Sequence, residues 1–510
     1  MTIELNNRIW SIAGSDCTGG AGIQADVKTA NNLGADACTV ITAVTAQNAI
    51  GVKEINPMSD AVILSQIQAL EEDRQADVIK IGLLANKQQV ELIANELIRI
   101  KANWEQAPTI VYDPVAIASN GDQLTEDDIL PAIKEKLLPL VDVLTPNNNE
   151  VQKLSGVYAF GWNCIKTAGE KILDLGVGSV VIKGGHLDIA QGHSVDYCTD
   201  GENHYWLASN KIDTEHSHGT GCTFASAIAA LLAQGYLLRD AFTIAKAYIN
   251  QGLKASADYQ GCYGPIKQGG WPENPEDFPQ VIVANSNLAQ ELEWEVEDNQ
   301  NFSAKFPQVD THKLGLYPVV DSLEWIERLL EAGVKTVQYR EKKLTGEALD
   351  IAIAKAVQLG KKYDARLFIN DYWQLAIKHQ AYGVHLGQED LDCANLKEIN
   401  QANLKLGIST HGHFEMLKAK QYQPSYLAVG AIFPTQTKDM TGQIQGVKTL
   451  TDLVKLNTEI PMVAIGGISL ERASLVANTG VGSIAVVTAI TKAKYPEQVI
   501  SEFNKILSCH

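Results

Sequence analysis

The chain has 510 residues, with 42 basic against 60 acidic side chains and a formal net charge of −18. A single hydrophobic core stops growing at about 250 to 300 residues, so this length predicts two domains. The negative charge argues against nucleic acid and membrane partners, because both present anionic surfaces. A small anionic substrate can still bind such a protein where backbone N–H groups, Lys, Arg or a metal ion make the local electrostatic potential positive.

The cysteines point to a reducing compartment. All eight are scattered between Cys17 and Cys509 without CxxC spacing, which fits neither a disulfide framework nor a structural zinc site. The first ten residues lack a basic segment followed by an apolar run, and no run approaches the ~20 apolar residues that span a bilayer. We therefore expect a cytoplasmic protein with small-molecule partners, and the sequence leaves a homo-oligomer open.

The first half alternates short β-branched runs with amphipathic segments. The runs cover 8–14, 38–44, 78–82, 109–113, 141–145 and 179–185. This rhythm is typical of a parallel α/β sheet with helices on its faces. Several runs end in Gly or Asp before a polar loop, which is where open α/β sheets place their ligands.

The alternation breaks near Gln268. The segment GGWPENPEDFP at 269–279 and the acidic stretch ELEWEVEDNQ at 291–300 interrupt it. We expect a first domain at 1–268, a partly acidic linker at 269–313 and a second domain at 314–510. The early part of this linker could equally be a surface excursion of the first domain.

The second half contains eight further strand candidates. They cover 316–321, 336–341, 366–371, 382–387, 404–410, 426–433, 462–467 and 483–490. Eight such strands in about 200 residues, with helical segments between them, predict a (βα)8 barrel of small size. Polar side chains at the strand ends suit a barrel active site.

In the first half, His218-Gly219-Thr220-Gly221-Cys222 leads directly into an apolar helical run. Small residues at a helix N-terminus let a phosphate approach free N–H groups and the positive end of the helix dipole. The same field would lower the pKa of Cys222, which could then accept a hydroxyl proton. The alternative is a simple helix cap with a small buried cysteine. Lys183 is a second cation that could approach phosphates, or an ordinary exposed lysine.

The motifs AGSDCTGGAGIQAD, ITAVTAQN, DPV, TPN, IKGGH and HGTGC occur in the order found in hydroxymethylpyrimidine and phosphomethylpyrimidine kinases. Residues 8 to 265 closely resemble this family, which implies a ribokinase-like fold and ATP as co-substrate. The resemblance implies that Gln47, Gly14 and Asp26 contact the pyrimidine. It also implies an anion hole at Gly219, Thr220 and Gly221, with Cys222 as the catalytic residue.

In the second half, Gln338, Arg340 and Lys342 should project to one side of an extended strand, where a diphosphate would be held well. Asp371 and Asp390 follow neighbouring strands and suit Mg²⁺, although Asp390 could instead be a helix N-cap. The spacing of His411 and His413 would also fit a metal pair, but without a third ligand we expect solvated histidines.

The motifs VQYREK, FINDY, GVHLGQEDL, LGISTH, AIFPTQTK and AIGGI resemble thiamine-phosphate synthases over residues 314 to 505. The resemblance implies that Mg²⁺ is held by Asp371 and Asp390. It implies pyrimidine-diphosphate contacts from Gln338, Arg340, Lys342, Asn370, Ser409 and Lys438. It implies thiazole-phosphate contacts from Thr435, Thr437, Gly467, Val487 and Thr488.

Together the two resemblances imply an enzyme of thiamine biosynthesis. Its first half would phosphorylate 4-amino-5-hydroxymethyl-2-methylpyrimidine twice with ATP. Its second half would join the resulting diphosphate to (carboxy)thiazole phosphate. Two alternatives stay open for the barrel: a thiazole tautomerase-like isomerase, which needs no diphosphate, and a ligand-binding module without catalysis.

Overall fold

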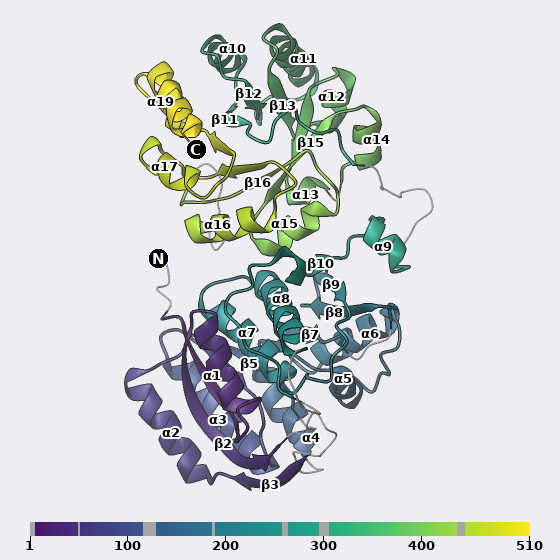
Figure 1. The fold of residues 1–510 in the computed structure, drawn as a ribbon, viewed down its shortest axis with the longest axis vertical. Helices are drawn as coiled ribbons and strands as arrows, with labels where there is room; N and C mark the ends of the chain where they lie inside the picture. Colours follow the sequence, from purple (N-terminus) through teal and green to yellow (C-terminus); the bar gives the residue numbers. More distant parts are fainter. Residues whose placement is uncertain are drawn as a thin grey trace. The chain divides into compact units, whose positions relative to one another are not determined.

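The computed structural model describes residues 6–48, 51–115, 129–185, 189–257, 264–294, 305–391, 393–435 and 444–509. The chain divides into two compact units, Met1–Ile282 and Val283–His510. The helices and strands of both units carry the labels of Figure 1.

The first unit is built on a ten-stranded sheet in the order β10-β9-β8-β7-β6-β5-β4-β1-β2-β3. Its strands are β1 (Arg8–Asp16), β2 (Asp36–Gln47), β3 (Val52–Pro57), β4 (Val78–Ile81), β5 (Thr109–Tyr112), β6 (Val143–Leu144), β7 (Ser179–Ile182), β8 (His193–Thr199), β9 (His204–Asn210) and β10 (Gln280–Val281). The central strands β2, β1, β4, β5, β6 and β7 are parallel. All four residues of β4 are buried, as expected for a strand covered on both faces.

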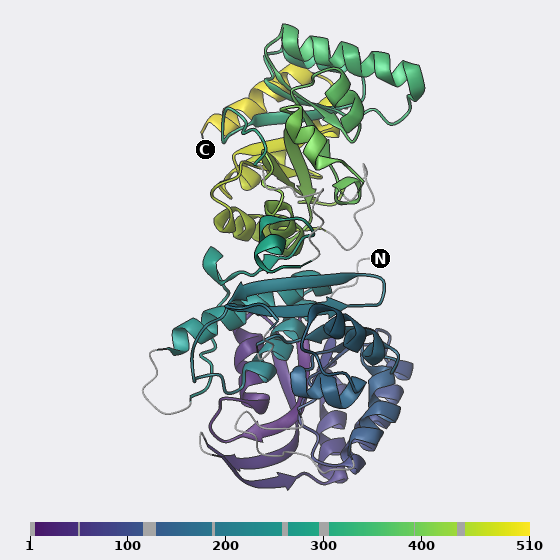
Figure 2. The same ribbon diagram turned by 90° about the vertical axis from the view of Figure 1, so that its right-hand side faces the viewer.

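Helices cover both faces of this sheet (Figures 1 and 2). They are α1 (Gly22–Asn32), α2 (Asp60–Asp73), α3 (Lys87–Asn103), α4 (Ile129–Ala132), α5 (Asn148–Ser155), α6 (Trp162–Leu173), α7 (Thr220–Ala233) and α8 (Leu238–Ser256). Helix α7 packs against both α1 and α8, so ten of its side chains are buried. Its continuous apolar sequence reflects this central position.

The edges of the sheet differ from the expectation of a purely parallel sheet. Strand β3 pairs antiparallel with β2, and β8, β9 and β10 continue the other edge in antiparallel pairs. The β8–β9 hairpin closes at Asp200-Gly201, where the Asp200 carboxylate accepts the N–H groups of Glu202 and Asn203. An Asp-Gly turn between alternating strands is a hairpin signal, and it could have been recognised in the sequence.

The expected linker does not stand apart from these units. Strand β10 pairs with β9, so residues 280–281 extend the first sheet. Helix α9 (Asn287–Glu291) follows the division between the units, and most of the acidic stretch lies outside the described residues. Further on, the Asp310 carboxylate binds Arg366 of the barrel.

The second unit contains a closed barrel of eight parallel strands, which confirms the predicted (βα)8 fold. The strands are β11 (Gly315–Val320), β12 (Thr336–Tyr339), β13 (Arg366–Asn370), β14 (Gly383–Leu386), β15 (Lys405–Thr410), β16 (Tyr426–Val429), β17 (Met462–Ile465) and β18 (Ser483–Val486). Strand β11 pairs with β18 and closes the ring. The described helices are α10 (Leu323–Glu331), α11 (Gly346–Lys362), α12 (Trp373–Lys378), α13 (Gln388–Leu391), α14 (Leu396–Gln401), α15 (His413–Lys420), α16 (Gly446–Leu456), α17 (Leu470–Ala477), α18 (Thr488–Thr491) and α19 (Pro496–Ser508).

A buried cluster that includes Tyr317, Phe368 and Tyr426 occupies part of the barrel interior. Tyr426 reaches this position because Gly407 on β15 has no side chain: a Cβ there would overlap the phenol ring. This steric demand explains the glycine in LKLGIST.

We expect Gly407→Ala to destabilise the barrel by about 1–3 kcal/mol, because the added methyl group overpacks the interior. Urea unfolding of the full chain, with the barrel followed by hydrogen exchange of β15 and β16, measures this. Gly270→Ala is the control, since nothing lies within 4 Å of its added Cβ. Equal stability of the two variants would contradict the packing argument.

Candidate active sites

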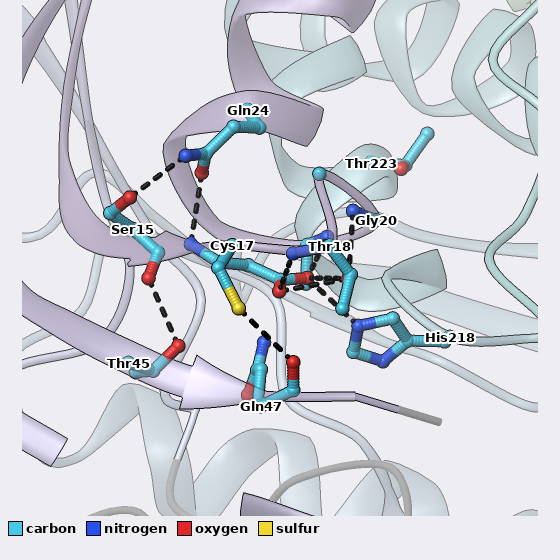
Figure 3. A network of polar contacts seen from close by, with 12 residues as sticks. Ser15, Cys17, Thr18, Gly20, Gln24, Thr45, Gln47, His218 and Thr223 are labelled. Carbon is cyan, nitrogen blue, oxygen red and sulfur yellow. Dashed lines mark hydrogen bonds and ion pairs between the residues drawn. The ribbon is translucent and has the colours of Figure 1, made fainter. Parts of the chain in front are cut away.

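The first glycine-rich loop follows β1, and Figure 3 shows Cys17 and Thr18 of this loop near Gln47 and His218. The loop is organised by Asp16, the last residue of β1. Its carboxylate accepts the N–H groups of Thr18 at 2.9 Å and Ala21 at 2.8 Å, and lies 3.0 Å from the His218 Nε2. Burial raises the pKa of Asp16, but hydrogen bonds from His218, Gln47 and Thr18 outweigh it and hold this pKa well below its usual range. Asp16 therefore joins the loop to the segment that precedes α7.

The two glycine-rich segments touch through their backbones. Gly219 has a φ of +78°, and a Cβ there would overlap the carbonyl oxygen of Gly20. Gly22 has a φ of +57°, and a Cβ there would overlap the carbonyl oxygen of Gly14. Only glycine satisfies both the left-handed conformation and the close approach. The structure thus brings together the two segments that the sequence suggested as one site.

Of the residues expected to contact the pyrimidine, Gly14 lies in β1 and Gln47 ends β2, and both adjoin this loop. The Gln47 side chain hydrogen-bonds Asp16, and the backbone carbonyl oxygen of Gln47 accepts the Cys17 thiol at 3.1 Å. At Gly14 a Cβ would come within 2.9 Å of the Leu83 side chain, so a larger residue would crowd Leu83.

Asp26 is completely buried and fully engaged by protein groups. It forms an ion pair with Lys80 at 2.8 Å and accepts the hydroxyls of Ser11 at 2.5 Å and Ser226 at 2.6 Å. Ser226 lies one turn after Cys222 on the same face of α7. These contacts join Asp26, which lies on α1, to α7. A contact between Asp26 and a pyrimidine stays a prediction.

Cys222 is the third residue of α7, after Thr220 and Gly221, and is half-buried. The expectation of a lowered thiol pKa is wrong for this structure. Burial raises the pKa of Cys222 to about 11; Lys80 opposes this shift, and the nearby carboxylates of Asp26 and Asp113 reinforce it. The loss of hydration outweighs the favourable helix N-terminus.

Lys183 is not an ordinary exposed lysine. Its ammonium group lies 2.6 Å from an Asp113 carboxylate oxygen and would be 3.2 Å from a Cβ placed on Gly221. The other Asp113 oxygen is buried and has no hydrogen-bond partner among the described residues. Burial raises the pKa of Glu150 to about 7; Lys183 lowers it and Asp113 raises it. Lys183 and Asp113 thus adjoin the start of α7, and Glu150 interacts with both of them, a grouping that only the fold reveals.

In the barrel, β12 ends at Tyr339, so strict strand alternation does not reach Lys342. The chain turns there because the Glu341 carboxylate accepts the N–H groups of Lys343 and Leu344. Gln338 is buried and donates to the Tyr317 hydroxyl at 3.5 Å. Arg340 follows the strand, and its backbone N–H donates to the backbone carbonyl of Val320.

The two predicted metal-binding carboxylates lie together. Asp371 follows β13 with a φ of +63° and forms an ion pair with Lys342. Burial raises the pKa of Asp390, and the adjacent Asp371 carboxylate raises it further. Asp390 lies in the first turn of α13, where it accepts the N–H of Gly387. It therefore caps its own turn and also faces Asp371.

Asn370 and Ser409 complete the described part of the predicted pyrimidine-diphosphate site. Asn370 ends β13 and is buried, while the Ser409 hydroxyl lies 2.8 Å from the His385 Nε2. Burial lowers the pKa of His385 to about 4, so its ring is neutral near pH 7. Sequence reasoning missed His385, although GVHLG places it on a strand.

The described residues of the predicted thiazole-phosphate site follow the last three strands of the barrel: Thr435 comes after β16, Gly467 after β17, and Val487 and Thr488 after β18. The loop before Thr435 packs on the Gly-Gly turn, where a Cβ on Gly467 would come within 2.7 Å of the Phe433 carbonyl oxygen. Val487 caps α18, and Thr488 begins it. Thr437 and Lys438 lie outside the described residues.

The expectation of solvated histidines is wrong for His413, which is completely buried in α15. His411 hydrogen-bonds Glu415 at 2.7 Å. Within the described ranges, no three His, Cys, Asp or Glu side chains form a metal-ligand group. Mg²⁺ does not require such a group, because it takes one or two carboxylates and adds substrate phosphate and water.

None of the helices in the described ranges combines the length and apolar character to cross a bilayer.

Removal of Lys80 should strongly destabilise the first unit, because Asp26 would remain as a buried, uncompensated charge. We expect Lys80→Met to cost about 3–5 kcal/mol. Urea unfolding of the full chain, with hydrogen exchange of β1 and α1 as the local readout, measures the loss. Lys87→Met, which removes an exposed pair with Glu91 at 3.9 Å, should change little. A small loss for Lys80→Met would contradict the ion-pair interpretation.

The raised pKa of Cys222 predicts slow alkylation in the substrate-free protein. At pH 8 only about one thiol in a thousand would be ionised, and the rate should rise with pH toward a midpoint near 11. Peptide-resolved mass spectrometry after iodoacetamide treatment measures this, with the exposed Cys509 as the accessible reference. Alkylation of Cys222 as fast as Cys509 at pH 8 would refute the prediction.

Comparison with known proteins matches two families in order along the chain. The family model of phosphomethylpyrimidine kinase matches residues 16–267, and that of thiamine monophosphate synthase matches residues 316–490. A thiamine-phosphate synthase of Serratia proteamaculans is 60% identical over 182 residues, which cover 36% of this chain and 86% of that protein.

Solved structures resemble the first unit. A pyridoxal kinase of Bacillus subtilis is 32% identical, with 52% of this chain and 98% of that chain covered and a TM-score of 0.47. A phosphomethylpyrimidine kinase of Clostridium difficile is 35% identical, with 48% of this chain and 98% of that chain covered and a TM-score of 0.42. With both family models in place, the chain belongs to the phosphomethylpyrimidine kinases through its first unit and to the thiamine-phosphate synthases through its barrel, and both are families of transferases.

Proposed function

We propose that the first unit phosphorylates 4-amino-5-hydroxymethyl-2-methylpyrimidine with ATP, first to the monophosphate and then to the diphosphate. We propose that the barrel joins this diphosphate to (carboxy)thiazole phosphate and releases thiamine phosphate and inorganic diphosphate. The observation that carries the proposal is the cluster of Lys342, Asp371 and Asp390 beside the predicted diphosphate site. A barrel that handled no diphosphate would have little use for it.

In the proposed kinase reaction, a substrate oxygen attacks the γ-phosphorus of ATP. A new O–P bond forms, and the bond to ADP breaks with its electron pair on ADP. The N–H groups at the start of α7 and the Lys183 ammonium group would stabilise the transferred phosphoryl group. Cys222 would accept the hydroxyl proton in the first step as a thiolate. Its raised pKa keeps the thiol protonated in the substrate-free protein, so this role requires the thiol to ionise when substrate and ATP are bound.

For the barrel we propose Asp371 and Asp390 as the carboxylates that hold Mg²⁺. Their fit rests on two facing carboxylates. Burial raises the pKa of Asp390, and repulsion by Asp371 raises it further; a cation would relieve this repulsion. When bound, Mg²⁺ neutralises charge on the diphosphate. The ammonium group of Lys342 already compensates Asp371 and lies where the same anion would bind.

In the proposed synthase reaction, the pyrimidine methylene carbon loses diphosphate, which leaves with the bonding electron pair. The thiazole nitrogen then donates its lone pair to that carbon and forms the C–N bond. No protein nucleophile is needed, so the demand on the site is electrostatic stabilisation of the leaving group. We propose Gln338, Arg340, Lys342, Asn370, Ser409 and Lys438 for the diphosphate substrate, and Thr435, Thr437, Gly467, Val487 and Thr488 for the thiazole phosphate.

The product of the proposed kinase is the substrate of the proposed synthase, which gives a chemical reason for their fusion. An isomerase barrel and a non-catalytic barrel are both less favoured, because the family of the second unit is thiamine-phosphate synthase. We further propose that the protein acts in the cytoplasm on small molecules, without nucleic acid or membrane partners.

We expect the full chain to form thiamine phosphate from hydroxymethylpyrimidine, ATP, Mg²⁺ and (carboxy)thiazole phosphate, detected as thiochrome fluorescence after oxidation. Cys222→Ala should lower this flux by about 10²–10⁴-fold through loss of the base. Arg340→Ala should lower it by about 10²–10³-fold through loss of leaving-group stabilisation. Cys509→Ala and Lys343→Ala, both exposed and outside the sites, are the matched controls.

Supplying pyrimidine diphosphate directly separates the two halves. It should restore product formation in Cys222→Ala but not in Arg340→Ala. A wild-type chain that makes product only from the supplied diphosphate would sink the kinase assignment. One that makes no product even then would sink the synthase assignment.

A further inference from the structure

A continuous chain of polar side chains crosses the interior of the barrel. The Ser409 hydroxyl lies 2.8 Å from His385 Nε2, and His385 Nδ1 lies 2.7 Å from the Tyr426 hydroxyl. That hydroxyl lies 2.7 Å from the Tyr317 hydroxyl, which in turn accepts the Gln338 side-chain amide at 3.5 Å. The five residues come from five different strands: β15, β14, β16, β11 and β12.

The three middle members are buried where a barrel ordinarily packs apolar side chains. Tyr426, Tyr317 and His385 are 0%, 1% and 6% exposed. Phe368 packs against both phenol rings, at centroid distances of 5.0 Å and 5.9 Å. Burying polar groups is unfavourable unless each is hydrogen-bonded, so a fully apolar layer would be the simpler core. The presence of these hydrogen-bonded polar side chains in the barrel interior therefore indicates a role beyond packing.

The two ends of the chain are residues that the proposed function assigns to the substrate. Ser409 and Gln338 both belong to the set proposed for the pyrimidine-diphosphate substrate, with Ser409 taken as a contact to its diphosphate and Gln338 as a contact to its pyrimidine ring. We infer that His385, Tyr426 and Tyr317 are positioning residues that fix the hydrogen-bond direction of Ser409 and Gln338. This inference rests on the proposed function, because it takes the diphosphate as the ligand of Ser409.

The donor and the acceptor of each hydrogen bond in this row of side chains follow from the number of hydrogens that each group carries. Diphosphate oxygens only accept, so the Ser409 hydroxyl must donate to them, and its oxygen then accepts the N–H of His385 Nε2. A neutral imidazole has one N–H, so Nδ1 accepts the hydroxyl hydrogen of Tyr426. Burial of the ring, in a side chain that is only 6% exposed, favours the neutral form.

The same logic continues to the other end. Once Tyr426 donates to His385, its oxygen accepts the hydroxyl hydrogen of Tyr317, and the Tyr317 oxygen accepts the amide N–H of Gln338. The amide oxygen of Gln338 is then left to accept an N–H from the amino group of the pyrimidine. Anion binding at one end thus selects the amide orientation that reads the aminopyrimidine at the other.

The test uses the full chain with Mg²⁺ and inorganic diphosphate as the binding probe, measured by calorimetry. Tyr426→Phe removes the central hydroxyl but keeps the ring. We expect it to weaken diphosphate binding about three- to tenfold and to raise the KM for pyrimidine diphosphate more than it lowers kcat. Ser409→Ala should weaken binding similarly, and the double variant should be no weaker than Ser409→Ala alone.

Tyr382→Phe is the matched control. This tyrosine also packs on Phe368, at 5.4 Å, but its hydroxyl hydrogen-bonds Asp310 outside the chain. It should leave diphosphate affinity unchanged. If Tyr426→Phe does not fold, Tyr317→Phe interrupts the same chain one link further and should give the same non-additive pattern with Ser409→Ala.

Three results would overturn the inference. Additive effects of Tyr426→Phe and Ser409→Ala would show that the phenol acts independently of Ser409. If Tyr426→Phe lowered stability but left diphosphate affinity unchanged, the hydrogen-bonded row of side chains would have only a structural role. A wild-type chain that binds no diphosphate and forms no thiamine phosphate would remove the proposed function and the inference with it, whereas an active wild type with additive variants would remove the inference alone.

Discussion

Parallel strand pairing is the constraint on which both sites depend. When neighbouring strands run in the same direction, all of their carboxyl ends meet at one edge, and the residues that follow them converge there. In the barrel, Lys342 follows β12, Asp371 follows β13 and Asp390 follows β14, and this pairing brings the three together. In the first unit, Asp113 follows β5 and Lys183 follows β7, and both adjoin the start of α7.

The two proposed sites would bind anions in a strongly negative protein by different local means. The first unit offers a helix N-terminus whose backbone is kept open by Gly219, with the Lys183 ammonium group beside it. The barrel instead places Lys342 against a pair of carboxylates, a pattern suited to a divalent cation between protein and phosphate. In both cases a carboxylate holds the lysine in place, which keeps a flexible cation positioned before the anion arrives.

Each unit also keeps a polar group in its interior at a cost in stability. Asp26 and Lys80 form a completely buried pair whose hydrogen bonds tie β1, α1, β4 and α7 together. The barrel holds its tyrosines and His385 in a hydrogen-bonded chain. Such groups resist substitution one at a time, because the remaining partner would be buried without compensation. Their positions just behind residues proposed to meet substrate suggest that precise placement of those residues outweighs the cost.

The sequence by itself determined the local elements and the two families. Strand runs such as RLFIND were recognisable because alternating or continuous apolar residues carry a local signal, and β13 spans Arg366–Asn370 as that signal predicted to within one residue. The glycine-rich segments before α1 and α7 were equally recognisable, because the steric freedom of glycine is a property of the residue itself.

The tertiary structure alone decided which polar residues meet and what that does to their charge. Periodicity shows that Lys80 lies on a buried strand, but its partner Asp26 lies on another element, and no local pattern links them. The helix dipole predicted a lowered pKa for Cys222, whereas burial raises it. The same limit hid His385, since desolvation and long-range pairing depend on atoms that are neighbours only in space.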